Sequence, residues 1–202
     1  MKKLLCTLLL LTSAFVQAGF DEGVTAAYKD DFQTAFKDWK PLAEQGDAAA
    51  QYNLGYMYNN GKGVPQNYTQ ALYWYKKAAE QGYANAQYNL GYMYNNGQGV
   101  SQNYTQAVYW YKKAAEQGNA DAQFNLGNMY GTGRGIPQNY KIAYILFNLA
   151  ASNGEADATQ NRDILAAKLS PATIEDAQRI TMQLHNSKNF AADLRNFLNS
   201  QK

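Results

Sequence analysis

The chain has 202 residues, with 18 basic and 16 acidic side chains, one cysteine and one histidine, and its formal net charge is +2. With a net charge so close to zero, the chain lacks the basic surface that binding to nucleic acid or to anionic membranes requires. A single cysteine and a single histidine also exclude an internal disulfide and a metal site built from thiolates or imidazoles.

The first 18 residues have the pattern of a cleavable signal peptide. Two lysines precede an apolar run over residues 4–11, and small residues end at Ala18. The run is shorter than the ~20 apolar residues that a membrane-spanning helix needs. We therefore expect a periplasmic or secreted protein that begins at Gly19, has lost Cys6 and the two lysines, is formally neutral, and does not insert into a membrane after cleavage.

Residues 19–46 are expected to form an N-terminal helical hairpin. Its two helices are predicted over Val24–Lys29 and Asp31–Leu42, with a short turn between them. Asp31 is a suitable N-cap for the second helix, because its carboxylate can accept a hydrogen bond from a backbone N–H of the first turn.

Residues 47–154 consist of three blocks of 36 residues. The first two, 47–82 and 83–118, differ at only five positions, and the third, 119–154, follows the same frame more loosely. A period of this length is typical of stacked supersecondary units, each of which buries its apolar face against the next. We therefore expect a repeat array rather than a globular core.

Each block predicts a helix, a loop and a second helix. In the first block Ala50, Leu54 and Tyr58 form one apolar stripe of a helix over about residues 47–59. A loop rich in asparagine and glycine follows, and Asn67 is placed to cap the second helix.

Three glycines lie in the middle of the first helices, at Gly55, Gly91 and Gly127. Each costs ~1 kcal/mol relative to alanine in a helix. Because the position is repeated, we expect something bulky to approach the backbone there, and the natural candidates are Trp74 and Trp110, or the backbones of neighbouring helices.

Residues 155–202 are expected to form capping helices. The first is predicted over 155–168 with Ile164 and Leu165 inward, and the second begins with Ser170 as N-cap and Pro171 in its first turn. A last helix is predicted over 190–198. The second helix is expected to bury Ile174, Ala177, Ile180 and Leu184.

The blocks resemble the Sel1-like repeat, a longer relative of the tetratricopeptide repeat. The matching residues are Ala-Gln-Tyr-Asn-Leu-Gly-Tyr-Met-Tyr at 50–58, Gly61-x-Gly63-Val64, Ala71-x-x-Trp74 and Ala78-Ala79-Glu80-Gln81-Gly82. The resemblance implies an all-α fold, a right-handed α-solenoid of antiparallel helix pairs, and a function as an adaptor. Residues 19–46 are closer to a tetratricopeptide hairpin than to these long-loop blocks.

The first helices also carry polar and aromatic residues on the side opposite the apolar stripe. If first helices line the concave side of the array, as in tetratricopeptide-like proteins, these residues predict a surface that binds a protein or peptide. Tyrosine and asparagine provide contact area and adaptable hydrogen bonds at small entropic cost. The alternative is that they only solvate the helix. The predicted partner-binding residues are Asn53, Tyr56, Asn60, Asn89, Tyr92, Asn96, Asn125 and Asn128.

The sequence offers little for catalysis. His185 stands alone near the end of a capping helix, with no nucleophile or base that can be named beside it. We therefore expect no enzyme activity, no catalytic residue, no metal and no cofactor. Two alternatives remain: an enzyme acting on cell-wall or β-lactam compounds, as described for some cysteine-rich Sel1-like proteins, and a glycan binder with Tyr56 and Tyr92 as stacking platforms.

Overall fold

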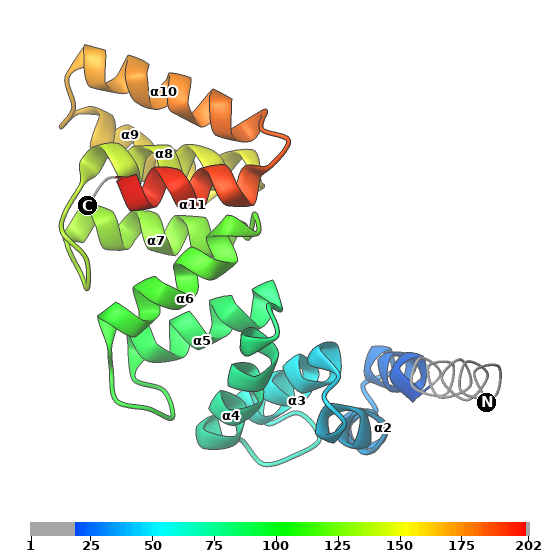
Figure 1. The fold of residues 1–202 in the computed structure, drawn as a ribbon. Helices are drawn as coiled ribbons and strands as arrows, with labels where there is room; N and C mark the ends of the chain where they lie inside the picture. The colour runs from blue at the N-terminus through cyan, green and yellow to red at the C-terminus, as the bar shows by residue number, and fades with distance from the viewer. Residues whose placement is uncertain (1–18, 201–202) are drawn as a thin grey trace, which may run out of the picture. The chain divides into compact units, whose positions relative to one another are not determined.

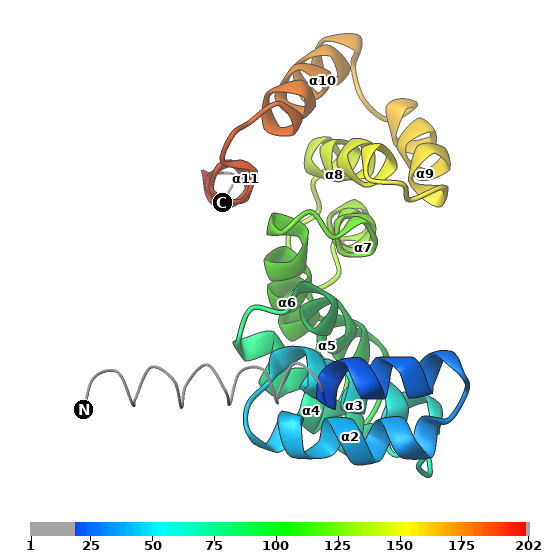
Figure 2. The same cartoon turned by 90° about the vertical axis from the view of Figure 1, so that its right-hand side faces the viewer.

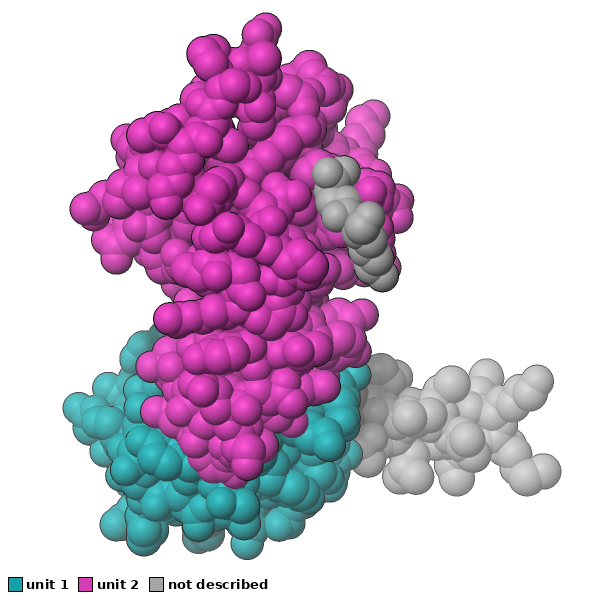
Figure 3. Space-filling view, turned by 90° about the vertical axis from the view of Figure 1, so that its left-hand side faces the viewer, with its two compact units in different colours: residues 1–83 teal, residues 84–202 magenta. Residues whose placement is uncertain are grey.

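The computed structural model describes residues 19–200, and within that range the chain is built of helices joined by turns, without a strand (Figure 1). The predicted signal peptide lies outside the described residues. The chain divides into two compact units, Met1–Tyr83 and Ala84–Lys202, which are coloured separately in Figure 3. The boundary falls one residue into the second 36-residue block. The predicted all-α fold of successive helix pairs is confirmed.

Unit 1 contains a helical segment over 19–28 and three further helices, α2 (Phe32–Glu44), α3 (Ala48–Asn60) and α4 (Tyr68–Glu80). The first helical segment starts earlier than predicted, because Phe20 and Gly23 pack against Trp39 of α2. The indole Nε1 of Trp39 donates to the carbonyl oxygen of Phe20 at 3.2 Å. Asp31 caps α2 as expected, and its Oδ1 accepts from the N–H of Thr34 at 3.1 Å.

Unit 2 continues the pattern with two helix pairs, α5–α6 and α7–α8, and then three terminal helices. Helices α9 and α10 both pack against α8, and α11 returns to pack against α6 (Figure 2). The helices are α5 (Ala84–Asn96), α6 (Tyr104–Glu116), α7 (Ala120–Thr132), α8 (Tyr140–Ser152), α9 (Asp157–Ala166), α10 (Pro171–His185) and α11 (Phe190–Ser200).

Asparagine caps start the second helix of every block. The side chains of Asn67, Asn103 and Asn139 each accept a hydrogen bond of 3.0 Å from the backbone N–H three residues later. The cap is stabilising because these N–H groups have no partner within the helix. The positive φ of Gly82 lets the chain leave α4 and enter the next helix after a short turn.

The predicted apolar stripe of the first helices is only partly right. Ala50 and Leu54 are fully buried, but the third buried position is Met57, and Tyr58 is only half-buried. At about 100° per residue, Met57 lies nearly in line with Ala50, whereas Tyr58 is turned about 80° away. In unit 2, Met93 is buried and Tyr94 is half-buried in the same way, but in the third block both Met129 and Tyr130 are buried, so the predicted stripe holds there.

The mid-helix glycines do admit bulky side chains, but these are not the predicted tryptophans. A Cβ on Gly55 would lie 2.5 Å from the ring of Tyr75, and one on Gly91 would lie 2.7 Å from the ring of Tyr111. In the third block, Phe147 fills the corresponding place. Trp74 packs instead on the other side of α4, in the core that unit 1 builds from α2 and α3. One helical position, a turn of about 100°, separates the two directions.

The first terminal helix, α9, is a degenerate fourth first helix of the array. Its buried Ala158 and Leu165 fall 36 residues after Ala122 and Met129, which are buried in α7. The prediction that Leu165 faces inward is confirmed, but Ile164 is 55% exposed and the prediction for it is wrong. Ile164 lies at the repeat position that points away from the second helices.

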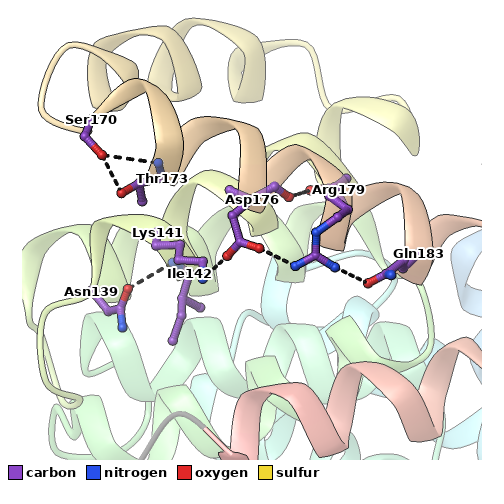
Figure 4. A network of polar contacts seen from close by, with 10 residues as sticks. Asn139, Lys141, Ile142, Ser170, Thr173, Asp176, Arg179 and Gln183 are labelled. Atoms are coloured by element: carbon purple, nitrogen blue, oxygen red, sulfur yellow. Dashed lines mark hydrogen bonds and ion pairs between the residues drawn. The ribbon is translucent and has the colours of Figure 1, made fainter.

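The second terminal helix is attached to α8 through a polar network (Figure 4). The carboxylate of Asp176 accepts from the ammonium of Lys141 on α8 and from the guanidinium of Arg179, which also donates to Gln183 Oε1 at 3.3 Å. The hydrogen bond from Lys141, followed by that from Arg179, lowers the pKa of Asp176 below its ordinary value of 3.8. Ser170 caps α10 as predicted. Ala177 and Leu184 of the same helix are buried.

This network should make the attachment of α10 sensitive to acid. Because the pKa of Asp176 is lower in the folded state, its contribution to stability is present above about pH 4 and is lost as the pH falls through the folded-state pKa. We expect Asp176→Asn to lower the melting temperature at pH 7, and we expect the difference from the parent to shrink as the pH is lowered below 4. Thermal unfolding across this pH range measures the difference in melting temperature. The control is Asp163→Asn, which removes an ion pair between adjacent residues of α9. A difference that does not change with pH would contradict the prediction.

Candidate partner-binding site

The predicted binding residues of unit 1 form one stripe of α3. Asn53, Tyr56 and Asn60 follow one another at helical spacing, on the side of α3 away from the buried Leu54 and Met57. The Tyr56 side chain is 43% exposed. The exposed Asn60 donates from Nδ2 to the backbone oxygen of Tyr56 at 2.8 Å, and Asn53 is half-buried. We call this surface, with its equivalents in unit 2, the first-helix face.

The structure brings the predicted residues of unit 2 together on α5 and α7. Tyr92 is again 43% exposed, Asn89 is half-buried, and the exposed Asn96 donates to the Tyr92 backbone oxygen at 3.1 Å. On α7, Asn125 and Asn128 are half-buried. The first-helix face of unit 2 is therefore a real surface that combines one open ring with several amides.

The two asparagines of α7 are partly engaged within the protein. Asn125 donates to the backbone oxygen of Asp121 at 2.9 Å, and the Oδ1 atom of Asn128 accepts from Asn161 of α9 at 3.1 Å. Asn161 was not predicted, although it lies 36 residues after Asn125 and continues the asparagine series. A search for the repeat beyond residue 154 could have found it, together with Ile164.

Sequence reasoning also missed Tyr88. It is half-buried on α5, and its ring centroid lies 6.5 Å from that of Tyr92 and 6.0 Å from that of Tyr111. Burial, and after it the nearby charge of Asp121, raises the pKa of Tyr88 to about 12. Its phenol is therefore neutral at physiological pH and can both donate and accept a hydrogen bond.

Buried glutamines fix the first helices beneath this face. Gln123 of α7 is buried; its Nε2 donates to the backbone oxygen of Ala115 at 3.2 Å, and its Oε1 accepts from Asn153 at 2.9 Å. In unit 1, Gln51 makes the same two hydrogen bonds: its Nε2 donates to the backbone oxygen of Ala43, and its Oε1 accepts from Gln81. Each glutamine is hydrogen-bonded to the ends of the preceding and the following second helix, so it connects the first helix to both of its neighbours.

The Tyr111 hydroxyl is a buried polar atom for which the described residues provide no hydrogen-bond partner. Burial raises the pKa of this hydroxyl well above its ordinary value. The corresponding residue of the third block is Phe147, which makes the same approach to a glycine without a hydroxyl.

We therefore expect Tyr111→Phe to stabilise the protein. Removing an unsatisfied buried hydroxyl avoids a desolvation cost of ~1–3 kcal/mol, and the ring that packs on Gly91 is retained. The measurement is urea unfolding monitored by circular dichroism. Tyr75→Phe is the matched control and should not stabilise, because the Tyr75 hydroxyl is not a buried atom left without a hydrogen-bond partner. A loss of stability in Tyr111→Phe, or an equal gain in both variants, would contradict the expectation.

Two exposed tyrosines on the second helices provide a rival surface. Tyr73 is 48% exposed and Tyr109 is 50% exposed. Each packs edge-on against the tryptophan that follows it, with ring centroids 4.9 Å apart. The ammonium groups of Lys77 and Lys113 lie 5.0 and 5.8 Å from the respective tyrosine rings. These rings are thus closely engaged by a tryptophan and a lysine of their own helix, whereas the ring contact of Tyr92 is the more distant one to Tyr88, at 6.5 Å between centroids.

Metal-ligating side chains are dispersed over the structure. Among residues 19–200, no three histidine, cysteine, aspartate or glutamate side chains lie together as a metal site would require. His185 is exposed at the end of α10. Over the same residues, every helix is too short or too polar to cross a lipid bilayer.

These features define a class of protein: an array of helix pairs of constant length, each pair joined by a glycine-rich loop. The Sel1 repeat pattern matches residues 48–83, 84–119 and 120–155, which is more than half of the chain. The chain belongs to the Sel1 repeat family. The matched frame begins one residue after the frame read from the sequence. Sel1 repeat proteins are generally non-catalytic scaffolds for protein interactions.

Solved structures support the same assignment. A Sel1 repeat protein from Oxalobacter formigenes is 34% identical, with a TM-score of 0.69 over 84% of this chain and 71% of that one. A protective antigen of uropathogenic Escherichia coli strains with an SLR fold is 28% identical, with a TM-score of 0.55, over 93% of this chain and 48% of that one. Helicobacter pylori cysteine rich protein B is 25% identical, with a TM-score of 0.50, over 62% and 95%. No curated protein matches the chain.

Proposed function

We propose that this protein is an exported, non-catalytic scaffold that holds a protein or peptide partner on its first-helix face, the concave side expected for tetratricopeptide-like arrays. One observation carries the proposal. Tyr56 and Tyr92 occupy the same repeat position, are exposed to the same extent, and stand beside amide side chains. An exposed aromatic ring that recurs with the repeat is not needed for solubility and is typical of a binding surface.

The chemistry of this face suits a polypeptide. A tyrosine ring provides a large contact area but loses only two side-chain torsions when it is fixed, and its hydroxyl can bond to a backbone group. The exposed amides Asn60 and Asn96 add donors and acceptors beside the rings. The buried glutamines hold the helices in place, so little ordering remains to oppose binding.

The proposal can be tested by affinity capture from the native compartment. The immobilised protein would be compared with the double variant Tyr56→Ala and Tyr92→Ala, and captured proteins would be quantified by mass spectrometry. We expect the double variant to lose at least about tenfold of the specific partner, because buried tyrosines at interfaces commonly contribute more than ~1 kcal/mol each.

The matched control is Tyr73→Ala with Tyr109→Ala, which removes equally exposed rings from the second helices. This control should bind the partner as the parent does. The proposal fails if both double variants bind every partner as well as the parent, or if only the second-helix variant loses binding.

The proposal that the protein is non-catalytic rests on the scarcity of reactive side chains. The one histidine is exposed, and the one cysteine of the sequence lies in the predicted signal peptide. The structurally similar Helicobacter protein is named as cysteine rich, and this chain cannot form the disulfides that such a name suggests. An assay with a chromogenic β-lactam should show no turnover. Turnover above the uncatalysed rate would restore the enzyme alternative.

Export is a proposal that rests on residues 1–18 alone. If the segment is a signal peptide cleaved after Ala18, the protein recovered from the periplasm or the culture medium should begin at Gly19. Intact-mass analysis distinguishes this product from the full-length chain. Recovery of the uncleaved chain in the cytoplasm would contradict export.

A further inference from the structure

The first-helix faces of the two units are nearly identical in sequence but have different neighbours. In unit 1, Tyr83 lies over Tyr52, with ring centroids 5.1 Å apart. In unit 2 the residue corresponding to Tyr83 is Asn119, which donates to Asn85 Oδ1 at 3.1 Å. Tyr88, the counterpart of Tyr52, therefore has no aromatic side chain over it at this position.

The two faces also differ in charge. Helix α3 of unit 1 carries no charged residue, although the carboxylate of Asp47 caps its N-terminus by accepting from the N–H of Ala50. Helices α5 and α7 of unit 2 carry no lysine or arginine. Unit 2 adds Asp121 in the first turn of α7 and Glu155 just before α9. The one basic residue of α9, Arg162, is paired with Asp163 at 2.7 Å. The first-helix face of unit 2 is therefore bordered by the carboxylates of Asp121 and Glu155.

The hydrogen bonds show that these groups belong to one surface. The bond from Asn119 to Asn85 places the start of α7 beside the start of α5, and the bond from Asn161 to Asn128 places α9 beside α7. Asp121 and Glu155 are also near enough to Tyr88 for their charges to raise its pKa, after burial. Tyr88 thus lies near two carboxylates, and Tyr92 lies beside Tyr88 on α5, with ring centroids 6.5 Å apart.

We infer that the first-helix face of unit 2 binds a basic side chain, lysine or arginine, of a peptide partner, over the rings of Tyr88 and Tyr92 and near Asp121 and Glu155. This inference rests on the proposed function and specifies the partner's chemistry. A cation is attracted by the negative face of a tyrosine ring, and the carboxylates add Coulomb attraction and draw it toward the site. An acidic segment would be repelled here, and a neutral one would gain nothing from the charges.

The test uses two blocked peptides and isothermal titration calorimetry. One has three lysines alternating with glycine, and the other has acetyl-lysine at the same places, so that only the charge differs. We expect the lysine peptide to bind at least about tenfold more tightly than the acetylated one. Its affinity should fall steeply with added salt, because the attraction involves solvent-exposed charges.

Variants locate the site. We expect Tyr92→Leu to weaken the lysine peptide about fivefold, and Tyr92→Phe, which keeps the ring, to leave it nearly unchanged. Asp121→Asn with Glu155→Gln should weaken binding and reduce its salt dependence. Tyr109→Leu is the matched control, since Tyr109 is an exposed ring of the same unit but lies on the second helix α6, outside the first-helix face, and it should have no effect.

The inference is overturned if the acetylated peptide binds equally well, if Tyr109→Leu weakens binding as much as Tyr92→Leu, or if the lysine peptide does not bind at millimolar concentration. Circular dichroism of each variant verifies the fold. The two proposals can fail separately. If a partner is captured through Tyr92 but neither peptide binds, the scaffold function stands and the inference of a basic side chain in the partner is wrong.

Discussion

Gly135→Ala is expected to destabilise the protein by about 2–5 kcal/mol. Gly135 has a φ of +70°, where a Cβ costs ~1–2 kcal/mol. A Cβ there would also lie 2.5 Å from the carbonyl carbon of Tyr104, and backbone cannot move aside as a flexible side chain can. Such overpacking adds ~1–3 kcal/mol. Urea unfolding measures the sum.

Gly133→Ala is the matched control on the same loop. Its φ of +74° carries the same conformational cost, but its Cβ would meet no atom nearer than Gln138 Cβ, at 3.4 Å. We expect it to lose only ~1–2 kcal/mol. Equal losses in the two variants would show that loop 133–139 does not pack against the start of α6 as described.

The second large effect concerns two glycines of α7. Gly127→Ala would place a Cβ 2.8 Å from the ring of Phe147. The rings at this position are buried and closely packed, so the ring has little room to move. We expect a net loss of ~1–3 kcal/mol, although alanine favours helix more than glycine does.

Gly131→Ala in the same helix should have the opposite sign. Its Cβ would lie 3.8 Å from Ala143 Cβ, which is an ordinary contact. The higher helix propensity of alanine therefore raises the free energy of unfolding without an opposing steric cost. A gain approaching ~1 kcal/mol is expected. Chemical denaturation of both variants decides the matter, and a gain in Gly127→Ala would contradict the packing described here.

Features that depend on local chemistry were predictable from the sequence. The asparagine caps, the Ser170 cap and the helix–loop–helix order of the blocks follow from hydrogen-bonding groups and turn residues within a few positions. The close approach at Gly55 was predictable for a similar reason, because a repeated loss of helix preference requires a compensating contact.

Features that depend on direction across helices were not predictable. Spacing could not distinguish Tyr75 from Trp74 as the residue that meets Gly55, since adjacent positions differ by about 100° and both are apolar aromatics. The prediction that Ile164 points inward was wrong because it ended the repeat at residue 154, whereas α9 continues the repeat.

For the candidate site, the sequence predicted the open tyrosines but not their surroundings. Tyr88 was missed because a half-buried ring looks like core in a helical pattern. The substitution of Asn119 for Tyr83 is visible in the alignment of the blocks, but its effect on Tyr52 and Tyr88 depends on which residues face each other between successive first helices. The assignment of Asn53, Tyr56, Asn60 and their counterparts to partner binding stays a prediction.

Photocrosslinking in the native compartment tests the central claim most directly. A benzophenone amino acid would replace Tyr56 or Tyr92 on the first-helix face, or Tyr73 or Tyr109 on the second helices, which are at least as exposed. Adducts would be identified by mass spectrometry. A first-helix scaffold should give a specific adduct from positions 56 and 92 and much less from 73 and 109. The same adduct at equal or greater yield from 73 and 109 would contradict it.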